Sequence, residues 1–348
     1  MKQGSVVHKT LEDQVHQTVA VEIQTKEDAW GLRIWNVIQG LKTLRETGMT
    51  RELEIWGVID GLVVNGIIDE VSFTCPDREL EEAEGKSKGK ATNVDANQAT
   101  ITDFLGTNRT IENNRVGMLS GLLSSPQKRS KIYLTDVKTR GVRSLPKAAS
   151  FRPTLMQLML YHRLFSDLAT GKVDKDVIFD RYGLEADRSF TDSFIAQIGG
   201  LNEGFYDAVP EGDSSQESQD FPDSTQDSMT TLLSHNSLRS LWGLMIDQFT
   251  STVPAGEKSI GNVLKVEYRS QTDGEILGVK TFLHDEETIG TYLAGEMGWW
   301  KGERAAQGVC VEEAYKCGYC EFAEDCSWRK NKIEEAKEKM RARTRSAV

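Results

Sequence analysis

The chain has 348 residues, 38% of them hydrophobic and 27% charged, which is enough for a sizeable hydrophobic core. No run of eighteen apolar residues is present, which excludes a predicted membrane span, and the first residues carry neither an apolar signal region nor an Arg-rich targeting pattern. The net charge is −11, but eight of the acids lie between Glu203 and Asp227, a stretch without Lys or Arg. The rest is close to neutral, so charge neither supports nor excludes a nucleic-acid partner.

Hydrophobic spacing predicts two amphipathic helices in the first part of the chain, over residues 5–20 and 27–46. The period then changes to that of a strand. Two β-branched runs with Asp60-Gly61 between them predict a β-hairpin over residues 52–73.

Later segments continue the alternation of strands and helices. The sequence KIYLTDVKTR predicts a strand, and Pro153 suits the first turn of a helix that runs through Leu164. A second hairpin is predicted over residues 263–283, around Asp273-Gly274. Further helices are predicted over residues 185–205, 232–250 and 286–297, and from Lys330 onwards.

Two polar stretches without a sustained hydrophobic period, residues 77–129 and 206–230, are predicted to be disordered insertions. The order of the remaining elements predicts one α/β domain over residues 1–348, in which helices flank a mixed sheet.

Asp136 and Lys138 are two residues apart on a predicted strand, so their side chains share a face. A carboxylate beside an ammonium can hold a divalent metal and position a water or a phosphate oxygen, although Asp-x-Lys also occurs on ordinary solvated strands. Asp69 lies among apolar residues, where a carboxylate costs free energy unless it is paired or binds metal. Alternatively, Asp69 could be a strand-end residue at the sheet surface. Asp60 is a weaker metal candidate, because its position in the Asp-Gly turn already accounts for it.

Gln157 and Tyr161 are four apart on a predicted helix and share a face. Tyr161 alone would fit the core, but Gln157 among leucines needs a polar partner. His8 is a lone histidine near a predicted helix start, where a surface or capping role is the ordinary interpretation.

Three of the five cysteines, Cys317, Cys320 and Cys326, are crowded into a region at residues 310–328. This spacing favours a metal or cluster site over a disulfide framework. A structural zinc site would need a fourth Cys or His, and only Cys310 is close. A [4Fe–4S] cluster with one remote thiolate fits equally well, and a disulfide or inert buried thiols remain the alternatives.

Taken together, these segments resemble the exonuclease V family, a RecB-like branch of the PD-(D/E)xK nuclease superfamily. The resemblance covers nearly the whole chain apart from the two insertions, and its specificity comes from the number and order of modest motifs. These motifs are GSVVHKTLE, REL, IWG, VVNGIIDEVSF, LTDVKTR, MQLMLY, VEYRSQ, GVKTF, WWKGERAAQGV and KCGYCEFAEDCSWR.

The resemblance implies a role for each matching residue. His8, Asp69 and Asp136 would bind Mg²⁺, with Lys138 as the catalytic lysine. The residues implied to contact substrate or DNA are Gln157, Tyr161 and Arg140. The basic run that follows adds Arg143 as a candidate DNA-binding residue. Cys317, Cys320 and Cys326 would supply three of the four cluster ligands.

The family's first cluster cysteine lies upstream of the histidine motif, and this chain has no cysteine there. We therefore expect an N-terminally shortened chain that binds the cluster weakly and has lost any targeting peptide.

The resemblance further implies a single-stranded DNA exonuclease that acts chiefly from 5′ ends, releases short oligonucleotides and serves DNA repair in the mitochondrion, the nucleus or both. We expect a monomer with single-stranded DNA and a single-strand DNA-binding protein as partners, and no membrane partner. The competing classes are a non-catalytic iron–sulfur DNA-binding protein and an iron–sulfur redox protein.

Overall fold

The structure is a computed structural model that describes residues 7, 10–11, 18–88, 131–199, 205–209 and 225–346. The chain divides into two compact units. Unit 1 consists of Met1–Leu145 and Gln157–Asp285, and unit 2 consists of Pro146–Met156 and Glu286–Val348.

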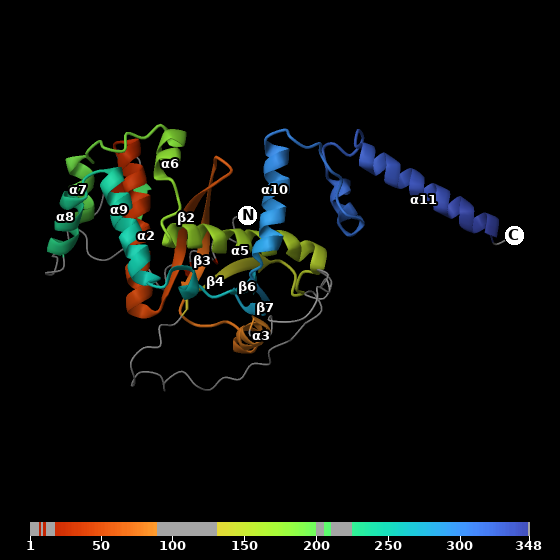
Figure 1. Cartoon of the computed structure of the whole chain (residues 1–348), viewed down its shortest axis with the longest axis horizontal. Coiled ribbons are helices and arrows are strands. Elements are labelled where there is room, and N and C mark those ends of the chain that lie inside the picture. Colours follow the sequence, from red (N-terminus) through yellow and green to blue (C-terminus); the bar gives the residue numbers. More distant parts are fainter. Residues whose placement is uncertain are drawn as a thin grey trace. The chain divides into compact units, whose positions relative to one another are not determined.

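Unit 1 is built on a five-stranded mixed sheet with the strand order β2-β3-β4-β6-β7 (Figure 1). Its strands are β2 (Met49–Ile59), β3 (Leu62–Ser72), β4 (Tyr133–Arg140), β6 (Val263–Ser270) and β7 (Ile276–Leu283). All neighbouring pairs are antiparallel except β4 and β6, which run parallel. The prediction of a mixed α/β sheet flanked by helices is therefore confirmed.

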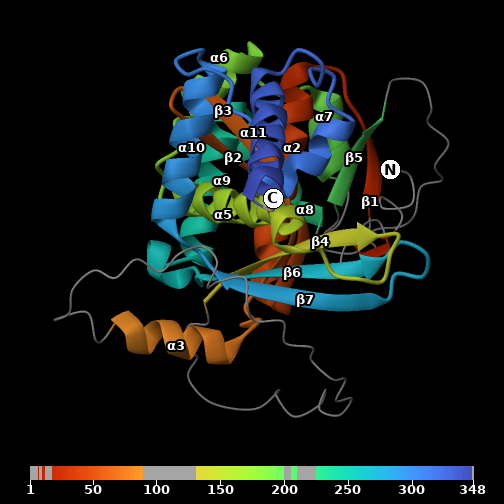
Figure 2. The same ribbon diagram turned by 90° about the vertical axis from the view of Figure 1, so that its right-hand side faces the viewer.

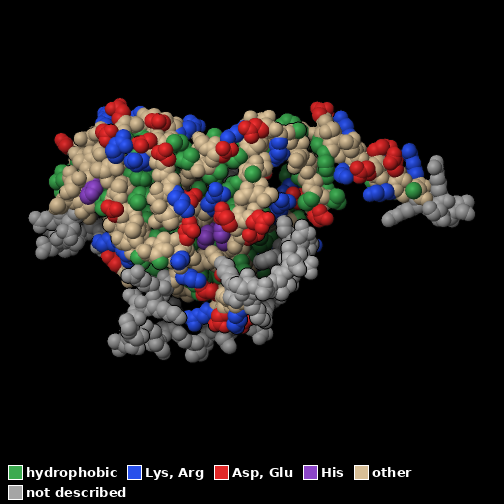
Figure 3. Space-filling model, in the orientation of Figure 1, with side chains coloured by type: hydrophobic (Ala, Val, Ile, Leu, Met, Phe, Trp, Pro, Cys, Tyr) green, Lys and Arg blue, Asp and Glu red, His purple; other side chains and the backbone are tan. Residues whose placement is uncertain are grey.

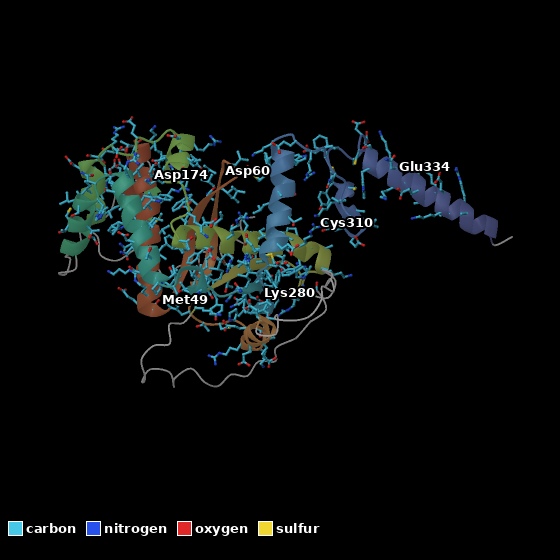
Figure 4. The ribbon with its side chains drawn as sticks, in the orientation of Figure 1. Met49, Asp60, Asp174, Lys280, Cys310 and Glu334 are labelled. Atoms are coloured by element: carbon cyan, nitrogen blue, oxygen red, sulfur yellow. The ribbon has the colours of Figure 1, made fainter. Side chains whose placement is uncertain are left out.

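Both predicted hairpins form. Asp60 and Gly61, at the turn between β2 and β3, have φ angles of 52° and 81°, the left-handed pair that a tight two-residue hairpin requires and that Asp-Gly adopts readily. Figure 4 labels Asp60 at the tip of this hairpin. The turn between β6 and β7 contains Gly274 at a φ of 72°.

Helices pack around the sheet and around one another in unit 1. The predicted helix at 27–46 is α2 (Lys26–Thr47), which begins at a capping box between Thr25 and Asp28 and ends at Gly48. It packs against β2 and against α9 (Figure 1). The other helices wholly within unit 1 are α3 (Arg78–Lys88), α6 (Lys175–Tyr182), α7 (Asp192–Gly199), α8 (Thr225–Ser234), α9 (Leu238–Thr252) and the 3-10 helix η1 (Gly256–Ser259).

The helix α5 (Ala148–Ala169) belongs to unit 2 up to Met156 and to unit 1 from Gln157 onwards. Within unit 1 it covers one face of the sheet, because Leu164 lies against Gly57 of β2 and Tyr161 lies against Gly66 of β3. Figure 2 shows α3 on the opposite side of the sheet from this part of α5.

Unit 2 contains the first turns of α5 together with the C-terminal elements. These are α10 (Glu286–Trp300), the 3-10 helix η2 (Val311–Gly318) and α11 (Ser327–Ser346). Of the residues that the structure describes, none belongs to a helix with both the length and the apolar character needed to cross a bilayer.

Several sequence-based boundaries need correction. Residues 18–20 belong to a strand, β1 (Thr18–Glu22), and not to the helix predicted over 5–20. This strand pairs in parallel with β5 (Phe205–Val209), a two-stranded sheet that was not predicted. Pro153 lies inside α5 and not in its first turn, since the helix begins at Ala148.

The two predicted insertions contain regular structure at their edges. The helix α3 lies within 77–129, while most of β5 and the start of α8 lie within 206–230. Most of the remaining insertion sequence, at 89–129 and 210–224, lies outside the described residues.

Candidate active site

The strand β4 places Asp136 and Lys138 on the same face, as their spacing predicts. The Lys138 ammonium donates a hydrogen bond to Asp136 Oδ1 at 2.8 Å. Asp136 is only 2% exposed, while about a third of the Lys138 side chain remains accessible, at 34%. A buried carboxylate is therefore held beside an ammonium that substrate can reach.

The neighbouring strand brings a second carboxylate to this point. The pairing of Glu70 with Thr135 places Asp69 in the same row as Asp136. The backbone N–H of Val137 donates a hydrogen bond to Asp69 Oδ2 at 2.5 Å. Two carboxylates from adjacent strands thus meet at β4, with Lys138 one step further along the strand.

An irregularity in the β2–β3 pair accompanies Asp69. The residue that would face it on β2, Glu52, has a φ of 51° and interrupts the run of paired residues. The nearest residues with 0% exposure on either side are three apart, where regular alternation would make them two apart: Thr50 and Leu53 on β2, and Ile68 and Val71 on β3. The register of the two strands is the same on both sides of this position, so the pairing is interrupted at Glu52 and Asp69 without an inserted residue. Nothing in the sequence pattern around Glu52 indicates this interruption of the strand pairing.

The polar partner expected for Gln157 is Tyr161, whose hydroxyl accepts a hydrogen bond from Gln157 Nε2 at 3.0 Å. Tyr161 lies directly on Gly66, where a Cβ atom would stand 2.3 Å from the ring. Only glycine leaves room for this packing, which fixes Tyr161 over β3. That Gln157 and Tyr161 also point toward Lys138 stays a prediction.

The two predicted DNA-binding arginines differ in their surroundings. Arg143 is largely exposed and forms an ion pair with Glu275. Arg140, at the end of β4, has its guanidinium carbon 5.9 Å from the centre of the Tyr268 ring. Basic and acidic side chains are interspersed over the surface of the molecule shown in Figure 3.

The carboxylates of Asp69 and Asp136 fit Mg²⁺, which binds through one or two carboxylates and fills its other positions with water and substrate oxygens. His8, the third predicted ligand, lies outside the described residues. Among the residues whose positions are described, no group of three or more His, Cys, Asp or Glu side chains is arranged to hold a metal ion. The two carboxylates thus form the described part of the candidate metal site.

In unit 2, Cys317 lies near the end of η2, Cys320 follows in the next turn, and Cys326 directly precedes α11. None of them forms a disulfide, and Cys310 is exposed at the start of η2. Free thiols in this short segment suit an iron–sulfur cluster chemically. The convergence of their sulfurs on one point stays a prediction.

A pair of stacked histidines in unit 1 was not foreseen. The rings of His162 on α5 and His284 after β7 lie 4.0 Å apart between centroids, at an interplanar angle of 22°. Burial, followed by the neighbouring His284, lowers the pKa of His162 to about 3, while the backbone of Gly261 opposes this shift. The two histidines are distant in sequence, so no local motif could have indicated their contact.

A second unpredicted cluster joins α3 to the edge of β4. The Glu81 carboxylate accepts hydrogen bonds from Tyr133 at 2.7 Å and from Lys131 at 2.8 Å. Burial alone would raise the pKa of Glu81, but the hydrogen bond from Lys131 and that from Tyr133 outweigh it and lower the pKa. Burial also raises the pKa of the nearby Cys75 thiol.

Comparisons with known proteins give a single family. A family model described as "Exonuclease V - a 5' deoxyribonuclease" matches residues 1–329. A protein from Danio rerio named "Exonuclease V" is 23% identical over 330 residues, which is 95% of this chain and 62% of the relative. A Candida albicans protein named "Exonuclease V, mitochondrial" is 30% identical over 82 residues, 24% of this chain and 13% of that relative. The chain therefore spans less than two thirds of the length of these relatives.

Proposed function

Because this chain belongs to the exonuclease V family, we propose that it is a deoxyribonuclease that hydrolyses phosphodiester bonds in DNA. The observation that carries the proposal is the meeting of Asp69 and Asp136 on adjacent strands, with Lys138 paired to Asp136 on the same face. This set, on a mixed sheet covered by a helix, supports assignment to the PD-(D/E)xK nucleases.

Asp69 and Asp136 would hold Mg²⁺, which when bound supplies Lewis-acid polarisation of a phosphate oxygen and lowers the pKa of water. The Val137 N–H fixes the Asp69 carboxylate, and burial fixes that of Asp136. Lys138, still partly accessible, would stabilise the negative charge that develops on the phosphate. The hydroxyl of Tyr161, held by Gln157, would help to place the substrate or the lysine.

We further propose that single-stranded DNA is the substrate, that it is degraded from the 5′ end in DNA repair, and that the protein acts in the mitochondrion, the nucleus or both. The name of the family supports the 5′ deoxyribonuclease activity, and the name of the Candida albicans relatives supports a mitochondrial role.

A direct cleavage assay tests the activity. Single-stranded DNA labelled at its 3′ end is expected to be shortened when Mg²⁺ is present and to stay intact with EDTA. Blocking the 5′ end with streptavidin should protect the strand if the enzyme enters there. Binding without cleavage would favour a DNA-binding protein, and neither binding nor cleavage, together with a reversible redox signal, would favour an iron–sulfur redox protein.

We propose as well that Cys317, Cys320 and Cys326 bind a [4Fe–4S] cluster. Anaerobic reconstitution with iron and sulfide is expected to produce the thiolate-to-iron charge-transfer absorbance, and changing any one of the three to Ser should weaken it. Cys310→Ser is the matched control and should leave the absorbance unchanged, because Cys310 precedes the segment from Lys316 to Arg329 that carries the family resemblance. Loss of the signal in that variant, or tightly bound zinc in place of iron, would contradict the assignment.

A further inference from the structure

The face of the sheet that carries Asp136 continues across β6 to β7. Asp136 pairs with Val266, and Val266 pairs with Lys280, so these three residues form one row across three strands. Since neighbouring strands are about 4.8 Å apart, the Cα atoms of Asp136 and Lys280 are separated by roughly 10 Å. Lys280, labelled in Figure 4 on β7, therefore shares a face with the candidate active site.

Arg140 lies on the same face, because it follows Asp136 by four residues on β4. Its Nε atom is buried and has no hydrogen-bond partner within the described part of the chain, and no ion pair there joins its guanidinium to a carboxylate. By contrast, Arg51 and Arg269 each form an ion pair with a glutamate of the sheet. A partly buried guanidinium without a counter-charge is costly unless an anion binds to it.

The guanidinium carbon of Arg140 lies 5.9 Å from the centre of the Tyr268 ring, and Tyr268 pairs with Gly278, two residues before Lys280 on β7. Burial, followed by the positive charge of Arg140, lowers the pKa of the Lys280 ammonium. Two cations thus lie near one another on a face that also carries the Lys138 ammonium. An anion bound between the two would interact favourably with both cations.

We propose that Arg140 and Lys280 together bind a phosphate of the DNA strand next to the phosphodiester that is cut. This inference rests on the proposed function. The pair would bind the sugar–phosphate backbone without contacting the bases. It would thereby position the adjacent phosphodiester at Asp69 and Asp136. Phosphate oxygens are the chemistry recognised, from either an internal phosphodiester or a 5′-terminal phosphate.

The test compares DNA binding by Lys280→Gln, Lys280→Arg, Arg140→Gln and the unchanged protein, with the full chain and with EDTA present to prevent cleavage. Fluorescence anisotropy of a labelled oligothymidylate is followed over a series of salt concentrations. The matched control is Lys258→Gln, since Lys258 is an exposed lysine of η1. Each phosphate contact of a single strand contributes about 0.7 to the slope of log affinity against log salt concentration.

We expect Lys280→Gln and Arg140→Gln each to weaken binding about three- to tenfold and to reduce that slope by about 0.7. Lys280→Arg should restore most of the affinity, and Lys258→Gln should match the unchanged protein. The thermal midpoints of Lys280→Gln and Arg140→Gln should stay close to that of the unchanged protein, because both side chains are partly exposed. A purely structural role would instead lower the midpoint together with the affinity.

Oligonucleotides with one neutral methylphosphonate linkage distinguish the two phosphate sources. If one internal methylphosphonate weakens binding to the unchanged protein but not to Lys280→Gln, the bound group is an internal phosphodiester. If the unchanged protein prefers a 5′-phosphate end over a 5′-hydroxyl end and Lys280→Gln does not, the bound group is the terminal phosphate. An unchanged slope in Lys280→Gln overturns the inference while leaving the nuclease proposal intact, whereas absence of DNA binding and cleavage by the unchanged protein removes the proposed function itself.

Discussion

Replacing Asp136 with asparagine is expected to reduce the rate of DNA cleavage by about a hundredfold or more, with little change in the fold. The substitution keeps the size of a residue that is 2% exposed but removes the charge beside Lys138 and one of the two metal-binding carboxylates. Asp69→Asn and Lys138→Ala should have effects of similar size. The measurement is the initial rate of release of labelled nucleotides in Mg²⁺, with circular dichroism as the check on folding.

Asp60→Asn is the matched control for these variants. Asp60 is an acidic residue of the same hairpin as Asp69, but it lies at the turn with a φ of 52°, a conformation that asparagine tolerates. It should cleave DNA at close to the normal rate. If Asp136→Asn also cleaved at a near-normal rate, the assignment of the active site would be wrong.

Local chemistry explains which parts of the fold could be predicted. Asp-Gly at a turn and alternation in the flanking strands are properties of neighbouring residues, so both hairpins were predicted correctly. The shared face of Asp136 and Lys138 follows in the same way from their spacing on a strand. The pairing of Gln157 with Tyr161 follows from the helical period.

The features that were missed depend on distant parts of the chain. The strand β1 pairs with β5 across a long sequence separation, so its residues adopt a strand where local spacing predicted a helix. Pro153 is accommodated inside α5, against the usual preference for the first turn. Long-range strand pairing overrides the local preference at β1. The left-handed φ of Glu52 lies at the break in the β2–β3 pairing, which the local sequence does not indicate.

The buried histidine pair predicts a strong dependence of stability on pH. The pKa of His162 is lowered to about 3 in the folded protein, against about 6.5 for an ordinary histidine. Above pH 6.5 the ring is neutral in both the folded and the unfolded chain. As the pH falls below 6.5, only the unfolded chain takes up the proton, so the free energy of unfolding should decrease by about 1.4 kcal/mol per pH unit until the pH nears 3.

The loss at pH 5 should therefore be about 2 kcal/mol relative to pH 7, as measured by urea titrations followed by circular dichroism. His162→Gln should largely remove this decrease, because glutamine does not titrate. His235→Gln is the control and should keep the full dependence, since His235 is partly exposed and contacts the carbonyl of Thr231, four residues away. Carboxylates ordinarily titrate below pH 5, so a decrease in the free energy of unfolding between pH 7 and pH 5 is attributed to protonation of histidine. Equal stability of the unchanged protein at both pH values would contradict a neutral, buried His162.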